Sequence, residues 1–271
     1  MPHDHAHPGP DTWWIPEALG VFLLASALTT YLVGVRRHRA RGSWPRYRTV
    51  LWIAGLICLG AAWIGPLASA AHSGFTAHMG VHLLLGMLAP LLLVLAAPGT
   101  LALRTLPPRH ARTVSRALRS PPVRVLTHPV VAAVLNVGGL WVLYTTGLFA
   151  LMHASHAVHV IVHAHVFLAG LLFTVAMIGP DPNPHRASFR TRAVVLVLFI
   201  AAHSVLGRWL YAHPPVGVDP ADARVGAQLM FYGGEIIDLA LLVLLFTGWY
   251  PGSRGRSRYL PRNPSREQTP P

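Results

Sequence analysis

Histidines recur at helical spacing inside two apolar stretches of the sequence. His78 and His82 are four residues apart in one stretch, and His156, His159 and His163 follow one another at spacings of three and four in the other. At about 100° per residue, each set forms one stripe along a helix. Ionisable side chains are costly in hydrocarbon and usually face a bundle interior. Because neutral imidazole is the commonest protein ligand for metals, the stripes predict metal binding.

The remaining donor side chains favour copper. Cys58 is the only cysteine, so the chain can form neither an internal disulfide nor a Cys-pair metal site. Met79 and Met152 lie in these two stretches or close to them, and Met230 lies in the last apolar stretch of the chain. Imidazole suits both copper and zinc, whereas thioether sulfur selects copper. We therefore expect copper as the bound ion, in an oxidation state that the sequence leaves open.

The elements that position these side chains are membrane-spanning helices. The 271 residues are 53% hydrophobic and only 11% charged, with a mean hydropathy of +0.46, which is typical of a polytopic membrane protein. Apolar runs long enough to cross a bilayer occupy residues 14–35, 49–70, 77–103, 126–150, 155–179, 191–212 and 225–250. The sequence therefore predicts an all-α fold, a bundle of about seven transmembrane helices.

Arginine placement predicts the orientation of this bundle. The net charge of +13 comes entirely from arginine, and nearly all arginines fall in alternate loops and the C-terminal tail. Such loops are cytoplasmic by the positive-inside rule, which places the N-terminus outside and the C-terminus in the cytoplasm. Because the charge follows topology rather than a soluble basic face, we expect no nucleic-acid partner.

Three regions follow from this reading. Residues 1–13 form an exoplasmic tail containing His3, His5 and His7, which could capture metal loosely. Residues 14–250 form the transmembrane domain, and residues 251–271 a disordered cytoplasmic tail rich in proline and arginine. Arginines at helical spacing between Pro107 and Arg124 favour an interfacial helix, with a solvated loop as the alternative.

The orientation also assigns a depth to each polar side chain, because a helix rises 1.5 Å per residue. His72 and His156 fall at the outer mouth of the bundle, and Asp238 falls near the midplane. His165 points away from the stripe and is expected to pack or cap. The side chains expected in the outer half of the membrane are His78, His82, His159, His163, His203 and Glu235.

Several motifs resemble a known family. They are the segments His78–Pro98, Thr127–Pro129 with Trp141 and Tyr144 downstream, His163–Phe173, Gly179–Pro182 and Asp222–Glu235. In this order they resemble the CtaG-type cytochrome c oxidase assembly proteins, the class linked to caa3-type oxidases, over roughly residues 49–250. The resemblance implies a polytopic bacterial plasma-membrane protein needed for oxidase maturation, with a suggested role in delivering copper to the buried copper centre of the oxidase.

The resemblance also suggests roles for particular residues. The expected ligands are His78, His82, His163, His203 and Glu235, which match polar positions of the family. His72, His156 and His159 would line the mouth through which metal enters, and Asp238 would act in the second shell or as a proton acceptor. The implied partners are a cytochrome c oxidase subunit and the lipid bilayer; the oligomeric state stays open.

Two other functions compete with copper delivery. A membrane haem carrier would use histidines on facing helices as axial ligands. An assembly scaffold would use the polar side chains in the outer half of the membrane only to hold the bundle together and to dock the oxidase. An enzyme is not expected, since the sequence contains no nucleophile motif, no glycine-rich phosphate loop and no HExxH pattern.

Overall fold

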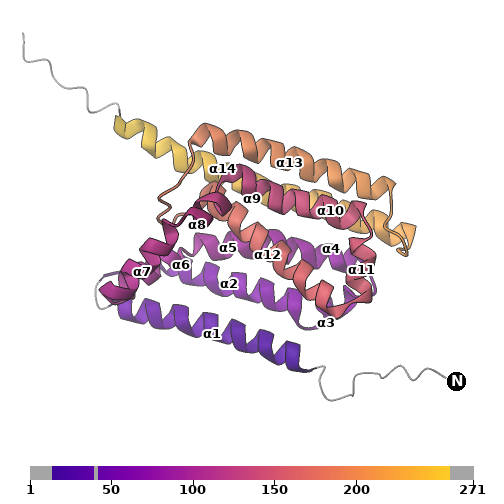
Figure 1. The fold of residues 1–271 in the computed structure, drawn as a ribbon, viewed down its shortest axis with the longest axis horizontal. Coiled ribbons are helices and arrows are strands. Elements are labelled where there is room, and N and C mark those ends of the chain that lie inside the picture. The colour runs from indigo at the N-terminus through magenta and orange to yellow at the C-terminus, as the bar shows by residue number, and fades with distance from the viewer. Residues whose placement is uncertain (1–13, 40–41, 257–271) are drawn as a thin grey trace, which may run out of the picture.

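The computed structural model describes residues 14–39 and 42–256, and the secondary structure in these ranges is helical (Figure 1). The predicted all-α class is thereby confirmed. In chain order the elements are α1 (Trp14–Arg39), α2 (Arg46–Trp63), α3 (Pro66–Ala70), α4 (Phe75–Leu83), η1 (Leu84–Leu88), α5 (Ala89–Leu95), α6 (Pro98–Thr105), α7 (Pro108–Leu118), α8 (Pro121–Leu126), α9 (Pro129–Ala133), η2 (Val134–Gly138), α10 (Gly139–Thr145), α11 (Leu148–Ala154), α12 (His156–Ile178), α13 (Phe189–Ala212) and α14 (Pro220–Arg256). The π-helical segments η1 and η2 join α4 to α5 and α9 to α10.

Among the described residues, six helical spans are long and apolar enough to cross a membrane, or seven if one bent pair counts as a single span. The bent pair falls where residues 126–150 were expected to be one straight helix. There the chain turns by 79° between Pro129–Thr145 and Leu148–Ala154. Thr146 is extended, and its hydroxyl accepts a hydrogen bond from the Leu148 amide at 3.2 Å. This side chain thus favours a new helix start over continuation of α10.

The predicted tails fall mostly outside the described part of the chain. Residues 1–13, with His3, His5 and His7, and residues 257–271 are not described. Helix α14 continues to Arg256, past the predicted domain end at residue 250. The orientation of the termini across the membrane stays a prediction.

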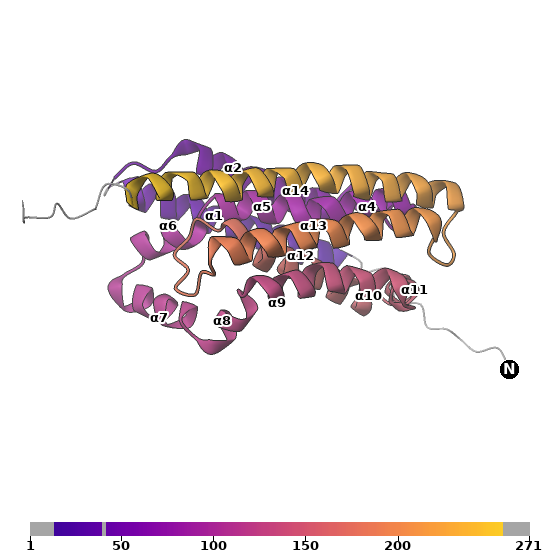
Figure 2. The ribbon, with the colours of Figure 1, turned by 90° about the horizontal axis from the view of Figure 1, so that it is seen from above.

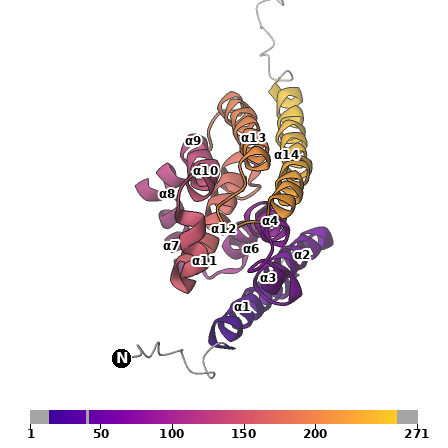
Figure 3. The same cartoon turned by 90° about the vertical axis from the view of Figure 1, so that its right-hand side faces the viewer.

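The segment from α4 through η1 to α5 forms the centre of the bundle (Figure 3). It contacts α2, α12 and α14, and it is more deeply buried than the other five unbroken spans. Glycines permit this close packing: a Cβ on Gly170 of α12 would collide with the carbonyl oxygen of Gly86 in η1. Small residues at such crossings let helix backbones approach one another in membrane proteins.

The arginine-rich segment after α6 is helical, as one of its two interpretations predicted. Helices α7 and α8 project from one end of the bundle (Figure 2). Arg109, Arg112 and Arg116 are exposed, whereas Val114 and Leu118 are partly buried. This separation of charged and apolar faces is typical of a helix at a membrane surface, and contact with headgroups stays a prediction.

Two aspartates cap the helix that begins the central segment and the helix that follows this segment. Asp222, near the start of α14, accepts hydrogen bonds from the amides of Phe75 (2.6 Å) and Thr76 (3.2 Å) and from the Thr76 hydroxyl (2.6 Å). Asp181 accepts hydrogen bonds in the same way from Gly99 and Thr100 at the start of α6. Both carboxylates satisfy amides that have no partner within their own helix. The two motif aspartates therefore act structurally.

We expect Asp222→Ala to lower the free energy of unfolding by about 1–2 kcal/mol, the usual cost of a lost helix cap. Asp222→Asn keeps one acceptor oxygen and should lose less. The measurement is thermal unfolding of the detergent-solubilised protein. Equal transition temperatures for Asp222→Ala and the unchanged chain would contradict this role.

Candidate functional site

Five histidines gather where α4 and α12 begin, at what is called here the histidine end of the bundle. His72 stacks on His159 with ring centroids 5.0 Å apart, and His159 stacks on His163 at 4.1 Å. His78 lies 6.1 Å from His163 and 6.0 Å from His153. His153 belongs to α11, and the bend after α10 places this helix across the histidine end. The stripes predicted on separate helices thus converge.

A deeper group lies beyond this outer cluster. The ring of His82 in α4 is 6.3 Å from that of His203 in α13, and His203 Nδ1 is 3.6 Å from Asp238 Oδ2 in α14. All three side chains are at most 5% exposed. The Nε2 atoms of His82 and His203 and both Asp238 oxygens are buried without a hydrogen-bond partner. Buried polar atoms usually have a hydrogen-bond partner or a ligand, so these atoms mark a position where a ligand could bind.

A small cavity joins the two groups. It has a volume of about 10 Å³ and is lined by His78, His82, His163 and Tyr144, among others. His78 Nε2 lies 3.1 Å from the Tyr144 hydroxyl. His163 Nδ1 lies 2.9 Å from the carbonyl oxygen of His159 and is therefore its donor, which leaves Nε2 as the ring acceptor. The cavity can hold about one water-sized object.

The spacing of the rings decides how an ion could be held. Metal–imidazole bonds are about 2.0 Å long, so two imidazoles on one ion have ring centres at most about 6 Å apart. The ring centres of His78 and His163 are 6.1 Å apart and those of His82 and His203 are 6.3 Å apart, at or slightly beyond this limit. Within the described chain, no three histidine, cysteine, aspartate or glutamate side chains already surround one point. The residues fit two-ligand, softly bound sites better than a closed tetrahedral one.

The methionines expected to favour copper lie beside the outer cluster. Met79, Met152 and Met230 are 1% exposed or less and share one buried cluster with Tyr144 and Phe149. The Met79 sulfur is 3.9 Å from the Tyr144 hydroxyl. Soft thioether sulfur is therefore available next to His78 without any cysteine.

A surface hollow gives this cluster access to the solvent. The hollow has a volume of about 190 Å³, and His72, His156, His159 and His163 line it together with Glu17. Three of these are the side chains predicted to line the mouth. Sequence reasoning missed Glu17, whose only signal is an acidic residue in the first turn of α1.

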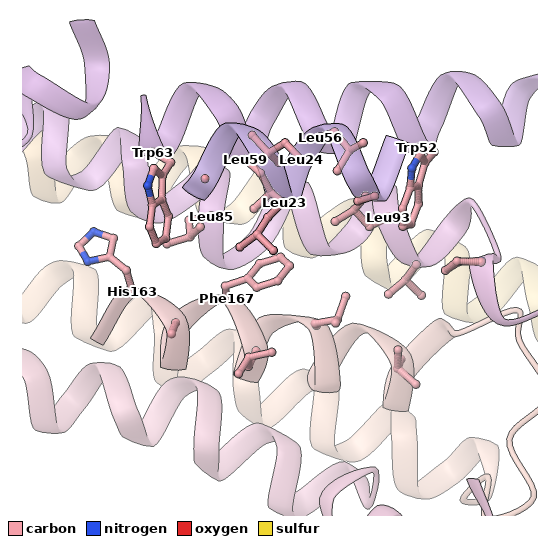
Figure 4. A pocket seen from close by; sticks show the side chains of 18 of the residues that line it. Leu23, Leu24, Trp52, Leu56, Leu59, Trp63, Leu85, Leu93, His163 and Phe167 are labelled. Atoms are coloured by element: carbon pink, nitrogen blue, oxygen red, sulfur yellow. The ribbon is translucent and has the colours of Figure 1, made fainter. Parts of the chain in front are cut away.

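An apolar groove of about 550 Å³ opens between α1, α2 and α12 (Figure 4). His163 and Trp63 lie at one of its ends, and Leu24, Leu56 and Phe167 line its length. His163 is therefore accessible from the apolar surroundings as well as from the hollow.

Glu235 is the predicted ligand that the structure does not bring to the histidines. Its side chain is exposed, among the exposed side chains of Tyr232, Ile236 and Leu239. Asp238, one turn along the same helix, faces inward instead. His165 likewise lies apart from the histidine cluster, as expected, with its Nε2 3.0 Å from the Leu135 carbonyl oxygen.

These features define a class: a multi-pass helical membrane protein whose interior carries a connected series of histidines. The model of one family, described as cytochrome c oxidase caa3 assembly factor, matches residues 29–251. The chain belongs to this family, which confirms the resemblance found in its motifs.

Relatives with similar sequences occur in mycobacteria. An uncharacterized protein of Mycobacterium leprae is 29% identical over 241 residues, and one of Mycobacterium bovis is 35% identical over 241 residues. The alignments cover 81% of this chain but only 37% and 36% of those proteins. The chain thus spans little more than a third of the length of these relatives. No solved structure matches it.

Proposed function

We propose that this chain assists the assembly of cytochrome c oxidase in a bacterial plasma membrane, in a non-catalytic role, by binding copper and passing it to the oxidase. The observation that carries the proposal is a series of neighbouring histidines that leads from the hollow to a small cavity, with the buried pair of His82 and His203 on the other side of this cavity. Each neighbouring pair along the series His72, His159, His163, His78 has ring centroids 6.1 Å apart or less.

Copper, as the cargo, would move along this series by exchange of ligands. His72, His156 and His159 take it from solvent, His163 and His78 hold it at the small cavity, and His82 and His203 bind it inside. Copper prefers imidazole and thioether ligands, both of which are present here. His72, His159 and His163 are stacked, so their rings would have to turn to present their lone pairs to one ion. With that rotation, a new bond could form before the old one breaks.

Asp238 would compensate the charge of the ion. A cation held only by neutral imidazoles leaves uncompensated charge at membrane depth, which is unfavourable. The Asp238 carboxyl lies 3.6 Å from His203 Nδ1 and has no other polar partner among the described residues. As a carboxylate it would balance the charge of the ion. It would also hold the neutral His203 ring with its proton on Nδ1, which leaves Nε2 as the ligand atom.

The two competing functions fit less well. A haem needs far more room between facing histidines than the cavity of about 10 Å³ at His78, His82 and His163 provides. The larger groove contains only one histidine, His163. A scaffold without metal would leave His203 Nε2 buried without a partner among the described residues, at about 1–3 kcal/mol.

The test is the copper, zinc and iron content of protein purified in mild detergent from copper-supplemented cells. We expect close to one copper per chain and no Soret absorption. Iron accompanied by a Soret band would replace the proposal with haem binding. Protein that stays metal-free even after copper(I) is added under reducing conditions would leave the scaffold function.

A further inference from the structure

A row of polar side chains runs along the outward face of α14. Arg224, Gln228, Tyr232 and Glu235 are exposed there, at spacings of three and four residues that keep them on one side of a helix. This row is called the polar stripe. Leu229, Ile236 and Leu239, also exposed, flank it and are typical of a surface in the bilayer.

The chain itself supplies partners for only part of the polar stripe. Arg208 of α13 lies over the ring of Phe231, at 5.0 Å, and Arg224 lies 6.0 Å from the ring of Tyr211. Among the described residues, Glu235 forms neither a hydrogen bond nor an ion pair. Glu235 lies seven residues beyond Gln228, about 10 Å further along the helix axis. A carboxyl group facing acyl chains at that depth is expensive and is rarely found without a partner.

The depths of the charges favour a different protein as the partner over a second copy. A two-fold axis along the membrane normal keeps every residue at its own depth, so Glu235 would face Glu235, and Arg224 would face Arg224. Like charges brought together in this way disfavour association. A complementary helix instead needs a cation or hydrogen-bond donor opposite Glu235 and acceptors at the level of Arg208 and Arg224.

We propose that the polar stripe is where a transmembrane helix of the oxidase docks, one that carries such a donor and such acceptors. Naming the oxidase as the partner rests on the proposed function. The stripe lies next to the inner histidine: a Cβ on Gly234 would collide with the His203 ring. At this glycine the backbone of α14 packs directly against the His203 ring, so a helix docked on the polar stripe would be separated from His203 by α14 alone.

The apolar groove at α1, α2 and α12 is the other candidate face. It offers almost no polar groups, and acyl chains of the bilayer fill such a surface without any protein partner. The polar stripe, in contrast, needs hydrogen bonds and opposite charges. A protein partner can provide these, whereas acyl chains cannot.

Site-specific photo-crosslinking in cells that assemble the oxidase tests the proposal. A photoreactive amino acid replaces Tyr232 on the stripe, Leu168 in the groove or Val142 on α10; their exposed fractions are 63%, 53% and 52%. We expect an adduct with an oxidase subunit from position 232 and none from 142. Three outcomes would each overturn the proposal. They are an oxidase adduct from position 168 but not from 232, an adduct of position 232 with a second copy of the chain, and no adduct from position 232.

A charge variant separates docking from copper binding. Glu235→Leu suits the bilayer and should leave the copper content unchanged, but it should reduce the oxidase that co-purifies by about tenfold or more, as loss of one partner of a buried charge pair does. Ile236→Leu, at the neighbouring exposed position, is the matched control and should change neither. If as much oxidase co-purifies with Glu235→Leu as with the unchanged chain, the docking proposal is wrong. If the unchanged chain contains no copper, only the copper proposal is wrong.

Discussion

Replacing His82 and His163 together by alanine is expected to reduce bound copper from about one ion per chain to background. The two side chains belong to different helices and line the same small cavity. Their loss removes one ligand from each close pair, His78–His163 and His82–His203. A single remaining imidazole in each pair cannot compete with solvent and detergent buffer for the ion, so metal analysis of purified protein should show the loss directly.

His165→Ala is the matched control for this variant. It removes a histidine from the same helix as His163, but one that contacts the Leu135 carbonyl oxygen rather than the cavity. Its copper content should equal that of the unchanged chain. If His82→Ala with His163→Ala retained full copper while folded, the assignment of the cavity would be wrong.

The second large effect is expected from a single methyl group. In Gly170→Ala, the new Cβ would lie inside van der Waals contact with the Gly86 carbonyl oxygen and within 3.2 Å of Pro90 Cγ. The obstacle is backbone in the most buried segment of the bundle, so neither helix can move aside without opening the core. We expect a loss above about 3 kcal/mol, the upper range for overpacked cores, seen as loss of the monodisperse peak in size-exclusion chromatography.

Gly138→Ala is the appropriate comparison. It makes the same change within a membrane helix, but its Cβ would meet only Val134 Cγ1, at 3.7 Å. This variant should purify normally. Equal recovery of the two variants would show that α12 and η1 can separate without cost.

The spans and their order could be predicted because both depend on local composition. A helix that crosses a bilayer satisfies its own backbone and needs only about 20 apolar residues. Each predicted run therefore coincides with a helical span, except residues 126–150. There the chain bends at Thr146, because a hydroxyl that accepts from the Leu148 amide offsets the loss of helix continuity.

The histidine stripes were also readable from spacing, since residues three or four apart share a helix face. Which stripes meet was not, because neighbour relations between helices depend on packing. The capping roles of Asp181 and Asp222 could not be predicted either. Asp181 is 82 positions from the amide that it caps, and Asp222 is 147 positions from its own. The sequence around either aspartate contains no pattern that predicts so distant a partner.

Glu235 marks the boundary between what sequence and tertiary structure decide. The amino-acid sequence determined that α14 crosses the membrane and carries Glu235 and Asp238 within one turn of each other. It could not tell which of them faces inward, because in a bilayer the lipid-facing side of a helix is as apolar as the packed side. Only the packing of α14 against α4 and α13 buried Asp238 beside His203 and left Glu235 exposed.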